Sequence, residues 1–373
     1  MKILGIETSC DETAASVVED GKILLSNVIA SSVDLHAAYG GVVPEIAARS
    51  HLESILPVID EAVKEVGWDN IDAIAVIQGP GLSGSLIIGV MTARTLAIAK
   101  QKPLYAIDHV HAHVYAAFLT EKANSLTLKA YSLPKEQPRF PLLALIISGG
   151  HTQLVFFRDH FKYTVLGQTV DDAVGEAFDK VAKILGLPYP GGPAIAKVAE
   201  RGNPKAIKLP KAKFDVRKFD VRSNVRGLTS HTKGDYRFSF SGLKTAVLRA
   251  SQAIAGKDFT LPSHELAGLL SGSQKDDIAA SFQRTALETL ITPVKIAVEE
   301  FKPTDIVVAG GVAANSELRR LLSESFENRV IYTDMKLCTD NAAMIAVLGF
   351  YKASLGQPAA DPYSLEIDPN LQM

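Results

Sequence analysis

The sequence is poor in cysteine, and this narrows the classes of protein that it can encode. Its two cysteines, Cys10 and Cys338, stand inside separate polar motifs and not in the spacing of a disulfide framework. Such frameworks hold together small secreted domains, so their absence favours a reducing compartment. We therefore expect a cytoplasmic protein.

Long apolar runs and an excess of one charge are also absent. No apolar stretch reaches the length of a membrane-spanning helix without a charge or a glycine-rich break. The run Ile3–Ile6 is too short for the hydrophobic part of a secretory signal. The net charge is -2 at pH 7, so any binding of nucleic acid requires a local basic patch.

The length and composition of the chain are those of an ordinary globular enzyme. Hydrophobic residues make up 47% and charged residues 21% of the sequence. Its 373 residues exceed what one hydrophobic core normally organises. We therefore expect two domains or lobes.

One strand-turn-strand pattern is used twice along the chain. Residues 3–18 contain two strands around a polar turn, followed by a hairpin at 19–22 and a third strand at 23–25. The same order returns at 141–157, with a further strand at 163–166. Each copy places a polar or glycine-rich turn between strands, where backbone amides and hydroxyls can approach phosphate.

Strands also alternate with helices, which predicts an α/β sheet in each lobe. A strand at Asp72–Ile77 leads through the glycine-rich Gly79–Gly84 into a helix at Leu86–Ala99. A second strand-to-glycine junction covers Asp305–Asn315 and leads into a helix at 317–322. An amphipathic helix that ends near Gly67 is predicted from apolar residues at helical spacing: Leu52, Ile55, Leu56, Ile59, Val63 and Val66.

Two histidines, His109 and His113, are four residues apart and would share one face of a helix, close enough to bind one ion. A distant acid such as Asp340 would complete a three-ligand site with open coordination positions, as a catalytic metal requires. The pair alone is equally compatible with hydrogen-bonding roles. Val110 stands where a His-Glu-x-x-His protease needs its general base, so we expect no hydrolysis of that type. His111 would face elsewhere and is expected to pack.

Three further motifs suit a ligand. The turn Ser148–Thr152 offers backbone amides and hydroxyls to an acyl or phosphate oxygen. Asp179 belongs to an acid-rich helix that opens at Asp171, and it could accept hydrogen bonds from ligand hydroxyls, as in ribose recognition. Asn315, after Gly310-Gly311, supplies both a donor and an acceptor. For the acids, simple solvation is the alternative.

Two segments interrupt the regular pattern and are predicted to be insertions. Residues 123–141 are rich in proline and polar residues. Residues 205–237 carry ten lysines and arginines among aromatic residues, facing only Asp215, Asp220 and Asp235. From charge alone the second segment is a solvated loop or a nucleic-acid contact.

Taken in order, these motifs resemble the TsaD family of tRNA threonylcarbamoyladenosine synthesis, in its bacterial branch. The resemblance covers nearly the whole chain and is specific because many motifs match in sequence order. The matching segments are Gly5–Thr13, Gly41–Arg49, Gly79–Gly84, the histidine pair, Ser148–Thr152, Gly175–Lys180, Phe238–Lys244, Gly310–Asn315 and Cys338–Asn341.

The resemblance implies an actin-like fold of the Hsp70-type ATPase superfamily, α/β in class. Its two lobes would each hold a mixed sheet flanked by helices, with the active site in the cleft between them. We place the amino-terminal lobe at 1–108 plus 341–373 and the carboxy-terminal lobe at 109–340. The implied activity is transfer of a threonylcarbamoyl group from threonylcarbamoyl-AMP to N6 of the adenosine 3′ of the anticodon, in tRNAs reading codons that begin with A.

The resemblance also implies roles for particular residues. His109, His113 and Asp340 would hold one divalent metal, and we expect Fe(2+), with Zn(2+) as the alternative, although manganese suits the same ligands. Many members of the family have an aspartate where this chain has Ala196, so the resemblance does not carry that one ribose contact over to this chain. The positions that would contact the adenylate substrate are Ser148, Gly149, Gly150, His151, Thr152, Asp179, Gly192 and Asn315.

The reaction needs a base, because the adenine amine must lose a proton as it attacks. Asp11 and Glu12 in the first polar turn are the candidates, with turn hydrogen bonding as the alternative role. Neither cysteine is needed as a nucleophile.

The resemblance implies several partners and leaves two other classes of protein open. The partners are tRNA, a catalytically silent homologue (TsaB-like) and a P-loop ATPase (TsaE-like), with no membrane, and we expect residues 205–237 to help dock tRNA. A sugar or acyl-phosphate kinase of the same architecture would share the phosphate turns but would not need the metal triad. An inactive binding scaffold, like the silent homologue, would lack that triad. The endopeptidase activity once attributed to the family has no support in these residues.

Overall fold

The computed structural model describes residues 1–373 apart from 38, 40, 122–136, 213–235 and 327–329. The chain forms two compact units, one built from Met1–Pro138 with Thr333–Met373 and the other from Arg139–Tyr332. Both predicted insertions, 123–141 and 205–237, fall largely outside the described residues.

The unit boundaries differ from the positions 108 and 340 expected from sequence. The chain crosses between units near 138 and 332, so the predicted metal ligands all belong to the first unit. The reason is packing, because helix α4 (His109–Tyr115) lies against helix α11 (Ala342–Ser354). This contact ties the segments around both helices to the amino-terminal strands.

The first unit is built on a mixed six-stranded sheet with the order β5-β4-β1-β2-β3-β6. Strands β1, β2 and β3 form an antiparallel meander, and β4 and β5 extend it in parallel from β1. The short β6 pairs with β3. The strands are β1 (Lys2–Glu7), β2 (Glu12–Glu19), β3 (Ile23–Ser31), β4 (Ala73–Gly79), β5 (Leu104–Asp108) and β6 (Thr120–Glu121).

The second unit repeats this topology in a mixed five-stranded sheet with the order β11-β10-β7-β8-β9. Again three antiparallel strands, β7 to β9, are followed by two parallel strands on the side of the first. The duplication predicted from the sequence pattern is therefore present. The strands are β7 (Leu142–Ile147), β8 (Thr152–Asp159), β9 (Lys162–Gln168), β10 (Asp305–Ala309) and β11 (Val330–Tyr332).

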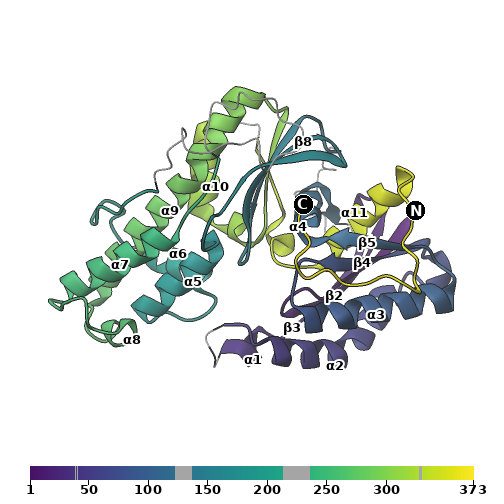
Figure 1. The fold of residues 1–373 in the computed structure, drawn as a ribbon, viewed down its shortest axis with the longest axis horizontal. Coiled ribbons are helices and arrows are strands. Elements are labelled where there is room, and N and C mark those ends of the chain that lie inside the picture. Colours follow the sequence, from purple (N-terminus) through teal and green to yellow (C-terminus); the bar gives the residue numbers. More distant parts are fainter. Residues whose placement is uncertain (38, 40, 122–136, 213–235, 327–329) are drawn as a thin grey trace, which may run out of the picture. The chain divides into compact units, whose positions relative to one another are not determined.

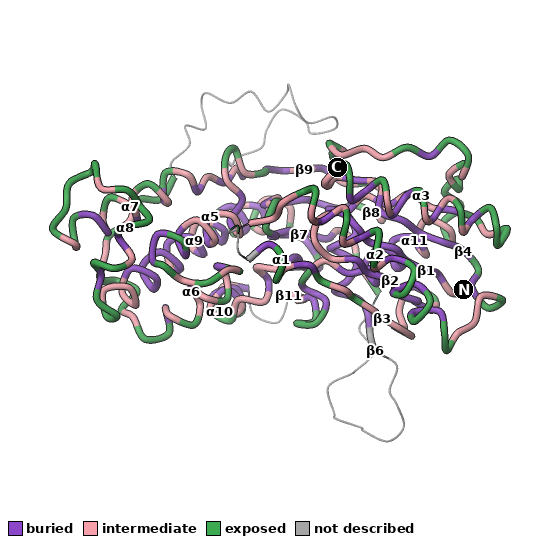
Figure 2. The backbone as a smooth tube through the Cα atoms, turned by 90° about the horizontal axis from the view of Figure 1, so that it is seen from below, coloured by how far each residue is buried: buried purple, intermediate pink, exposed green. Residues whose placement is uncertain are grey.

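Helices cover both faces of the first sheet. Figure 1 shows α2 (Pro44–Val63) and α3 (Ser83–Lys100) on one face and α11 on the other. Gly5 in β1 allows α11 to approach closely, since a Cβ there would lie 2.2 Å from the Ala342 carbonyl oxygen. In Figure 2 the central strands β1, β2 and β4 are drawn as mostly buried, so they form the core.

The second unit has one long helix, α9 (Gly272–Phe301), at the centre of its helical layer. A capping box formed by Ser271 and Gln274 begins this helix, as expected from the exchange of side-chain and backbone bonds. Shorter helices surround it: α5 (Val174–Leu185), α6 (Gly191–Ala199), α7 (Ser241–Ile254), α8 (Ser263–Leu266) and α10 (Ser316–Phe326).

Helix α2 differs from the simple amphipathic helix predicted from sequence. Ile55, Ile59 and Val63 are buried as expected, but Leu52 and Leu56 are 66% and 65% exposed. The prediction that these two leucines face the core is therefore wrong. The helix carries a second, outward apolar stripe, which the period of the pattern alone cannot separate from the first. In the part of the chain that the structure describes, no helix combines the length and hydropathy needed to cross a bilayer.

Candidate metal centre and ligand turns

The two histidines are presented by α4, a short helix that follows β5 directly. Asp108 ends the strand and caps the helix, since its side chain accepts a hydrogen bond from the His111 backbone N–H at 2.8 Å. The whole of α4 is buried, which fixes its side chains in place. His109 and His113 lie one turn apart on one face, whereas the His111 ring packs against Tyr115 at 5.4 Å, as its spacing predicts.

Asp340 is presented by a turn just before α11. The neighbouring Asn341 is fully buried, caps α11 by accepting from the Met344 backbone N–H, and donates to the carbonyls of Leu337 and Thr339. One amide therefore satisfies both the helix end and the turn. This explains the Cys338–Asn341 motif, in which the asparagine holds the aspartate in position.

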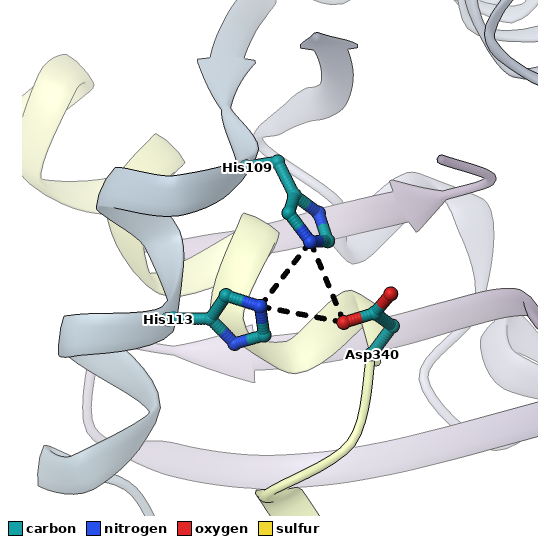
Figure 3. Close-up of side chains that lie close together, drawn as sticks. All are labelled: His109, His113 and Asp340. Atoms are coloured by element: carbon teal, nitrogen blue, oxygen red, sulfur yellow. Dashed lines mark hydrogen bonds and ion pairs between the residues drawn. The ribbon is translucent and has the colours of Figure 1, made fainter. Parts of the chain in front are cut away.

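Side chains of His109, His113 and Asp340 point toward one another (Figure 3). The two Nε2 atoms are 3.2 Å apart, and the Asp340 Oδ1 lies 3.4 Å from His109 Nε2 and 3.3 Å from His113 Nε2. The centre of a triangle with sides of about 3.3 Å is about 1.9 Å from each corner, so a point slightly off its plane lies at the usual metal bond length of about 2.0–2.2 Å. The three residues thus fit one divalent cation and supply three of its ligands.

A carboxylate that the sequence analysis missed supports this triad. Glu7, at the end of β1, is fully buried, and its Oε2 lies 3.3 Å from His109 Nδ1, with Ser9 Oγ at the same distance. The other Glu7 oxygen accepts the Ser9 backbone N–H at 2.6 Å. Because a carboxylate only accepts, it favours the tautomer with hydrogen on Nδ1, which leaves the Nε2 lone pair for a metal. The signal in the sequence that could have identified Glu7 was its position as the one acid at the end of a strand whose preceding residues, Ile3–Ile6, are apolar.

The charges around the triad favour a bound cation. Burial opposes the charged forms of both His109 and Asp340. Even so, the carboxylates of Asp340 and Glu7 raise the pKa of His109 well above its usual range. The two imidazoles in turn hold the pKa of Asp340 well below its usual range. The fully buried Glu7 and half-buried Asp340 carboxylates therefore favour positive charge between them, which protons or a metal ion can supply.

The turn that carries Asp11 and Glu12 lies within electrostatic reach of the triad. Burial, with a contribution from the Asp340 carboxylate, raises the pKa of Glu12 to about 9. The same causes raise the pKa of the Cys10 thiol, so it stays protonated and is a poor nucleophile, in line with the sequence analysis. With this pKa the Glu12 carboxyl is protonated at neutral pH in the metal-free chain, and it could accept a proton only in its ionised form.

In the second unit, the predicted turn at Ser148 closes on itself. The Ser148 backbone N–H donates to the His151 carbonyl at 2.9 Å, and the His151 N–H donates to Ser148 Oγ at 3.1 Å. Gly149 and Gly150 are exposed, and a Cβ added to either would meet no atom within 4 Å. The amides of Ser148 and His151 thus serve the turn itself, and the two exposed glycines between them remain predicted ligand contacts.

Two other glycines bring further backbone to the same turn. A Cβ on Gly175, in the first turn of α5, would lie 2.6 Å from the Ser148 carbonyl oxygen. Gly310, which follows β10 with a φ of 92°, would place a Cβ 2.5 Å from the Ile147 carbonyl oxygen. The turn, the start of α5 and the end of β10 thus meet around Ser148.

The remaining predicted contacts also belong to the second unit, where several serve its own structure. Thr152 Oγ1 accepts from the Val174 N–H at 2.9 Å, at the start of α5. Asn315 caps α10 through the Leu318 N–H and donates to Gln283. The Asp179 carboxylate accepts from Gly191 at 2.6 Å, and burial raises its pKa, while the adjacent Gly192 is open. These residues remain predicted ligand contacts.

The fold and the triad together define a class of protein: a duplicated α/β chain of the actin-like type with a candidate metal centre in its first unit. The crystal structure of full-length HypF in its phosphate- and nucleotide-bound form shares this fold, with a TM-score of 0.55 and 13% identity. The match covers 96% of this chain and 47% of HypF. The predicted fold class is confirmed.

Sequence comparison identifies the family. Residues 23–347 match the family TsaD, tRNA N6-adenosine threonylcarbamoyltransferase. A protein of that name from Thermomicrobium roseum is 47% identical over 367 residues, covering 95% of this chain and 93% of the relative. The Bacillus subtilis protein of that name is 42% identical over 379 residues, covering 100% and 96%. This chain belongs to the TsaD family, which confirms the resemblance seen in its motifs.

Proposed function

We propose that this chain transfers a threonylcarbamoyl group from threonylcarbamoyl-AMP to N6 of the adenosine 3′ of the anticodon, in tRNAs that read codons beginning with A. The observation that carries the proposal is the triad of His109, His113 and Asp340, present in a chain of the threonylcarbamoyltransferase family. A kinase of the same architecture would need the ligand turns but would have no use for two buried histidines and an aspartate that converge on one point.

The protein groups around the triad prepare it for a divalent ion, for which we propose iron(II), with zinc as the alternative. Such an ion supplies Lewis-acid polarisation of a carbonyl oxygen. Glu7 orients His109, Asn341 orients Asp340, and the buried helix α4 holds His113. Two nitrogens and one oxygen suit either metal.

Proton removal from the adenine amine is assigned to the acidic turn after β1. We propose Glu12 as the general base, with Asp11 as its neighbour in the same turn. Burial and the nearby Asp340 carboxylate raise the pKa of Glu12, and a divalent ion held by the triad would oppose this shift and favour the ionised form that acts as a base. An adenylate is a good leaving group, so positioning and polarisation contribute more than a strong nucleophile.

The turns of the second unit are proposed to bind the adenylate donor. The exposed amides of Gly149 and Gly150 can donate to its phosphate or acyl oxygens, with Ser148, His151 and Thr152 beside them. Asp179, Gly192 and Asn315 would contact the nucleoside.

Binding of tRNA is proposed to involve the basic segment 205–237. Its described part includes the exposed Lys205 and Lys208, while Lys211 pairs with Glu288 at 2.6 Å. Phosphate contacts of this kind give affinity that falls with salt. Both cysteines are free thiols, which agrees with the cytoplasmic location that we propose for a tRNA-modifying enzyme.

A protein partner is proposed for the outward apolar stripe of the first unit. Leu52 and Leu56 on α2 are exposed, and so are Ile87 and Met91 on the adjacent α3. Large apolar side chains grouped on neighbouring helices are typical of helix-mediated association. We propose that the catalytically silent homologue docks here and that a P-loop ATPase completes the complex.

The direct test is incubation of the purified chain with threonylcarbamoyl-AMP and unmodified tRNA, with and without the two partners. We expect the modified nucleoside, detected by mass after tRNA digestion. Its absence in every combination would remove the proposed function. A phosphorylated sugar or acyl product from ATP would instead favour the kinase.

A further inference from the structure

The proposed bases Asp11 and Glu12 are the last residue of the turn between β1 and β2 and the first residue of β2, and the helices around this turn hold its backbone. Two carbonyl groups are held in this way, those of Cys10 and Asp11. A carbonyl oxygen only accepts hydrogen bonds, so each contact shows which partner atom carries the hydrogen. The donors come from α2, α3 and the residue before α1 (Val33–Ala37).

The Cys10 carbonyl is held by His51 of α2, a fully buried residue. His51 Nε2 lies 3.0 Å from this oxygen, so Nε2 carries the hydrogen. Burial lowers the pKa of His51, which keeps the ring neutral, so Nδ1 accepts from the Thr13 hydroxyl at 2.8 Å. Ser85 of α3 donates to the same carbonyl at 3.3 Å.

The Asp11 carbonyl is held through a second fully buried histidine, His36 of α1. The Val43 backbone N–H donates to His36 Nδ1 at 3.2 Å, so this nitrogen accepts and the ring hydrogen lies on Nε2. That nitrogen lies 3.1 Å from Ser32 Oγ, and the serine hydroxyl donates to the Asp11 carbonyl at 2.8 Å. In this series of hydrogen bonds, from Val43 through His36 and Ser32 to Asp11, each hydrogen points to the next residue, so the direction of every bond is fixed.

We propose that His51 and His36 are positioning residues for the transfer reaction: they fix the backbone from Cys10 to Glu12 and thereby aim its carboxyl groups at the metal centre. The proposal depends on the proposed function only for the identity of the reaction that the two histidines assist. Neither histidine is among the residues that approach the triad. Their effect is therefore on the rate of the chemical step, not on metal or substrate binding.

The chain offers a matched pair of substitutions at His51. His51→Gln keeps an amide donor near the position of Nε2, facing Cys10, whereas His51→Asn keeps one only near Nδ1, facing Thr13. Ser26→Ala is the control for general loosening of α2, because Ser26 Oγ donates to the Ala62 carbonyl of the same helix at 2.7 Å, away from the turn.

We expect kcat of the holoenzyme complex to fall by about tenfold to a hundredfold in His51→Asn, since small displacements of reacting groups cost this much. KM for tRNA, KM for donor and bound metal should stay unchanged. His51→Gln should recover most of the rate, and Ser26→Ala should match the wild type. If His51→Asn does not fold, Ser85→Ala removes the second donor to Cys10 and should lower kcat in the same way.

Hydrogen exchange of the backbone around residues 9–13 supplies a readout that needs no transfer activity. We expect faster exchange there in His51→Asn than in Ser26→Ala, even if the wild type transfers nothing, so failure of the proposed function is distinguishable. Wild-type exchange and kcat in His51→Asn and Ser85→Ala would overturn the proposal. Equal losses in His51→Asn and His51→Gln, or a fall in metal content, would overturn it too.

Discussion

The first turns of the two units, Thr8–Asp11 and Ser148–His151, occupy equivalent places between the first two strands of equivalent sheets, yet they are held in opposite ways. The first is locked from outside by side chains from surrounding helices, and its own polar groups are mostly buried. The second is closed by bonds within itself, and its glycines face solvent.

This difference separates two tasks that a group-transfer enzyme must perform. A turn that aims acids at a metal centre needs rigidity, which packed neighbours provide. A turn that offers backbone amides to an anion needs open space and no side chain. The same strand unit supports both because only the turn residues and their neighbours change.

The largest expected effect on this contrast comes from removing the proposed base Glu12, which directly follows the first turn as the first residue of β2. We expect Glu12→Gln to lower kcat by about a hundredfold or more, the usual contribution of a general base. Asp11→Asn should have a smaller effect, and Asp20→Asn, in the exposed turn between β2 and β3, should have none. Single-turnover rates measure this directly, and a Glu12→Gln enzyme at the wild-type rate would shift the role to Asp11.

Glu7→Gln weakens the support of the first turn without touching its bases. The amide has one acceptor oxygen where the carboxylate offers two, so it cannot accept from both the Ser9 N–H and His109 Nδ1–H, and we expect metal affinity to fall by about tenfold to a hundredfold. Titration of metal into the metal-free chain measures this, with Glu19→Gln at the far end of β2 as control. Unchanged affinity would show that Glu7 serves only the Ser9 N–H.

Alanine substitutions at two glycines of the second unit distinguish a position with free space around it, Gly149, from one packed against other backbone, Gly310. Gly149→Ala should leave stability unchanged, since its Cβ meets nothing, but should raise KM for the donor several-fold. Gly310→Ala should cost about 1–3 kcal/mol of folding free energy, because it combines a left-handed φ with a Cβ 2.5 Å from a carbonyl oxygen. Denaturant unfolding and donor titration compare the two, and a destabilised Gly149→Ala chain would contradict the open turn.

A pH dependence of stability is also predicted for the metal-free chain. The pKa of Glu12 rises from 4.5 to about 9 on folding, so between these values the folded state binds more protons than the unfolded state. Its contribution is therefore present below pH 4.5 and is lost as pH rises toward 9, with a slope of at most about 1.4 kcal/mol per pH unit. The carboxyl is partly exposed, so the observed slope should be smaller.

Glu12→Gln should flatten this slope in unfolding curves measured at several pH values. An identical slope in the variant would mean that other groups control the pH dependence.

The sequence predicts most of the fold because period and turn chemistry agree in most elements. The histidine spacing on α4 and both strand units follow from local pattern. The outward leucines of α2 do not, because Leu52 and Leu56 share a helical period with buried neighbours and only tertiary packing separates the two stripes.

Several roles in the candidate site could not be predicted from sequence because they depend on contacts between residues far apart along the chain. The role of Glu7 depends on a histidine 102 residues away, and those of His36 and His51 depend on a turn outside their own helices. Asp340 could be proposed only as a candidate, because the distance between segments is set by the packing of α4 on α11 and not by local spacing. The unit boundaries were displaced for the same reason.

The central claim is that His109, His113 and Asp340 hold one divalent cation that the reaction needs. The most direct measurement is elemental analysis of the purified chain and of an Asp340→Asn variant, paired with the transfer assay on the same samples. We expect about one ion per wild-type chain with transfer activity, and neither in the variant. A wild-type chain that transfers the group without a bound ion, or a variant that keeps both, would contradict the account.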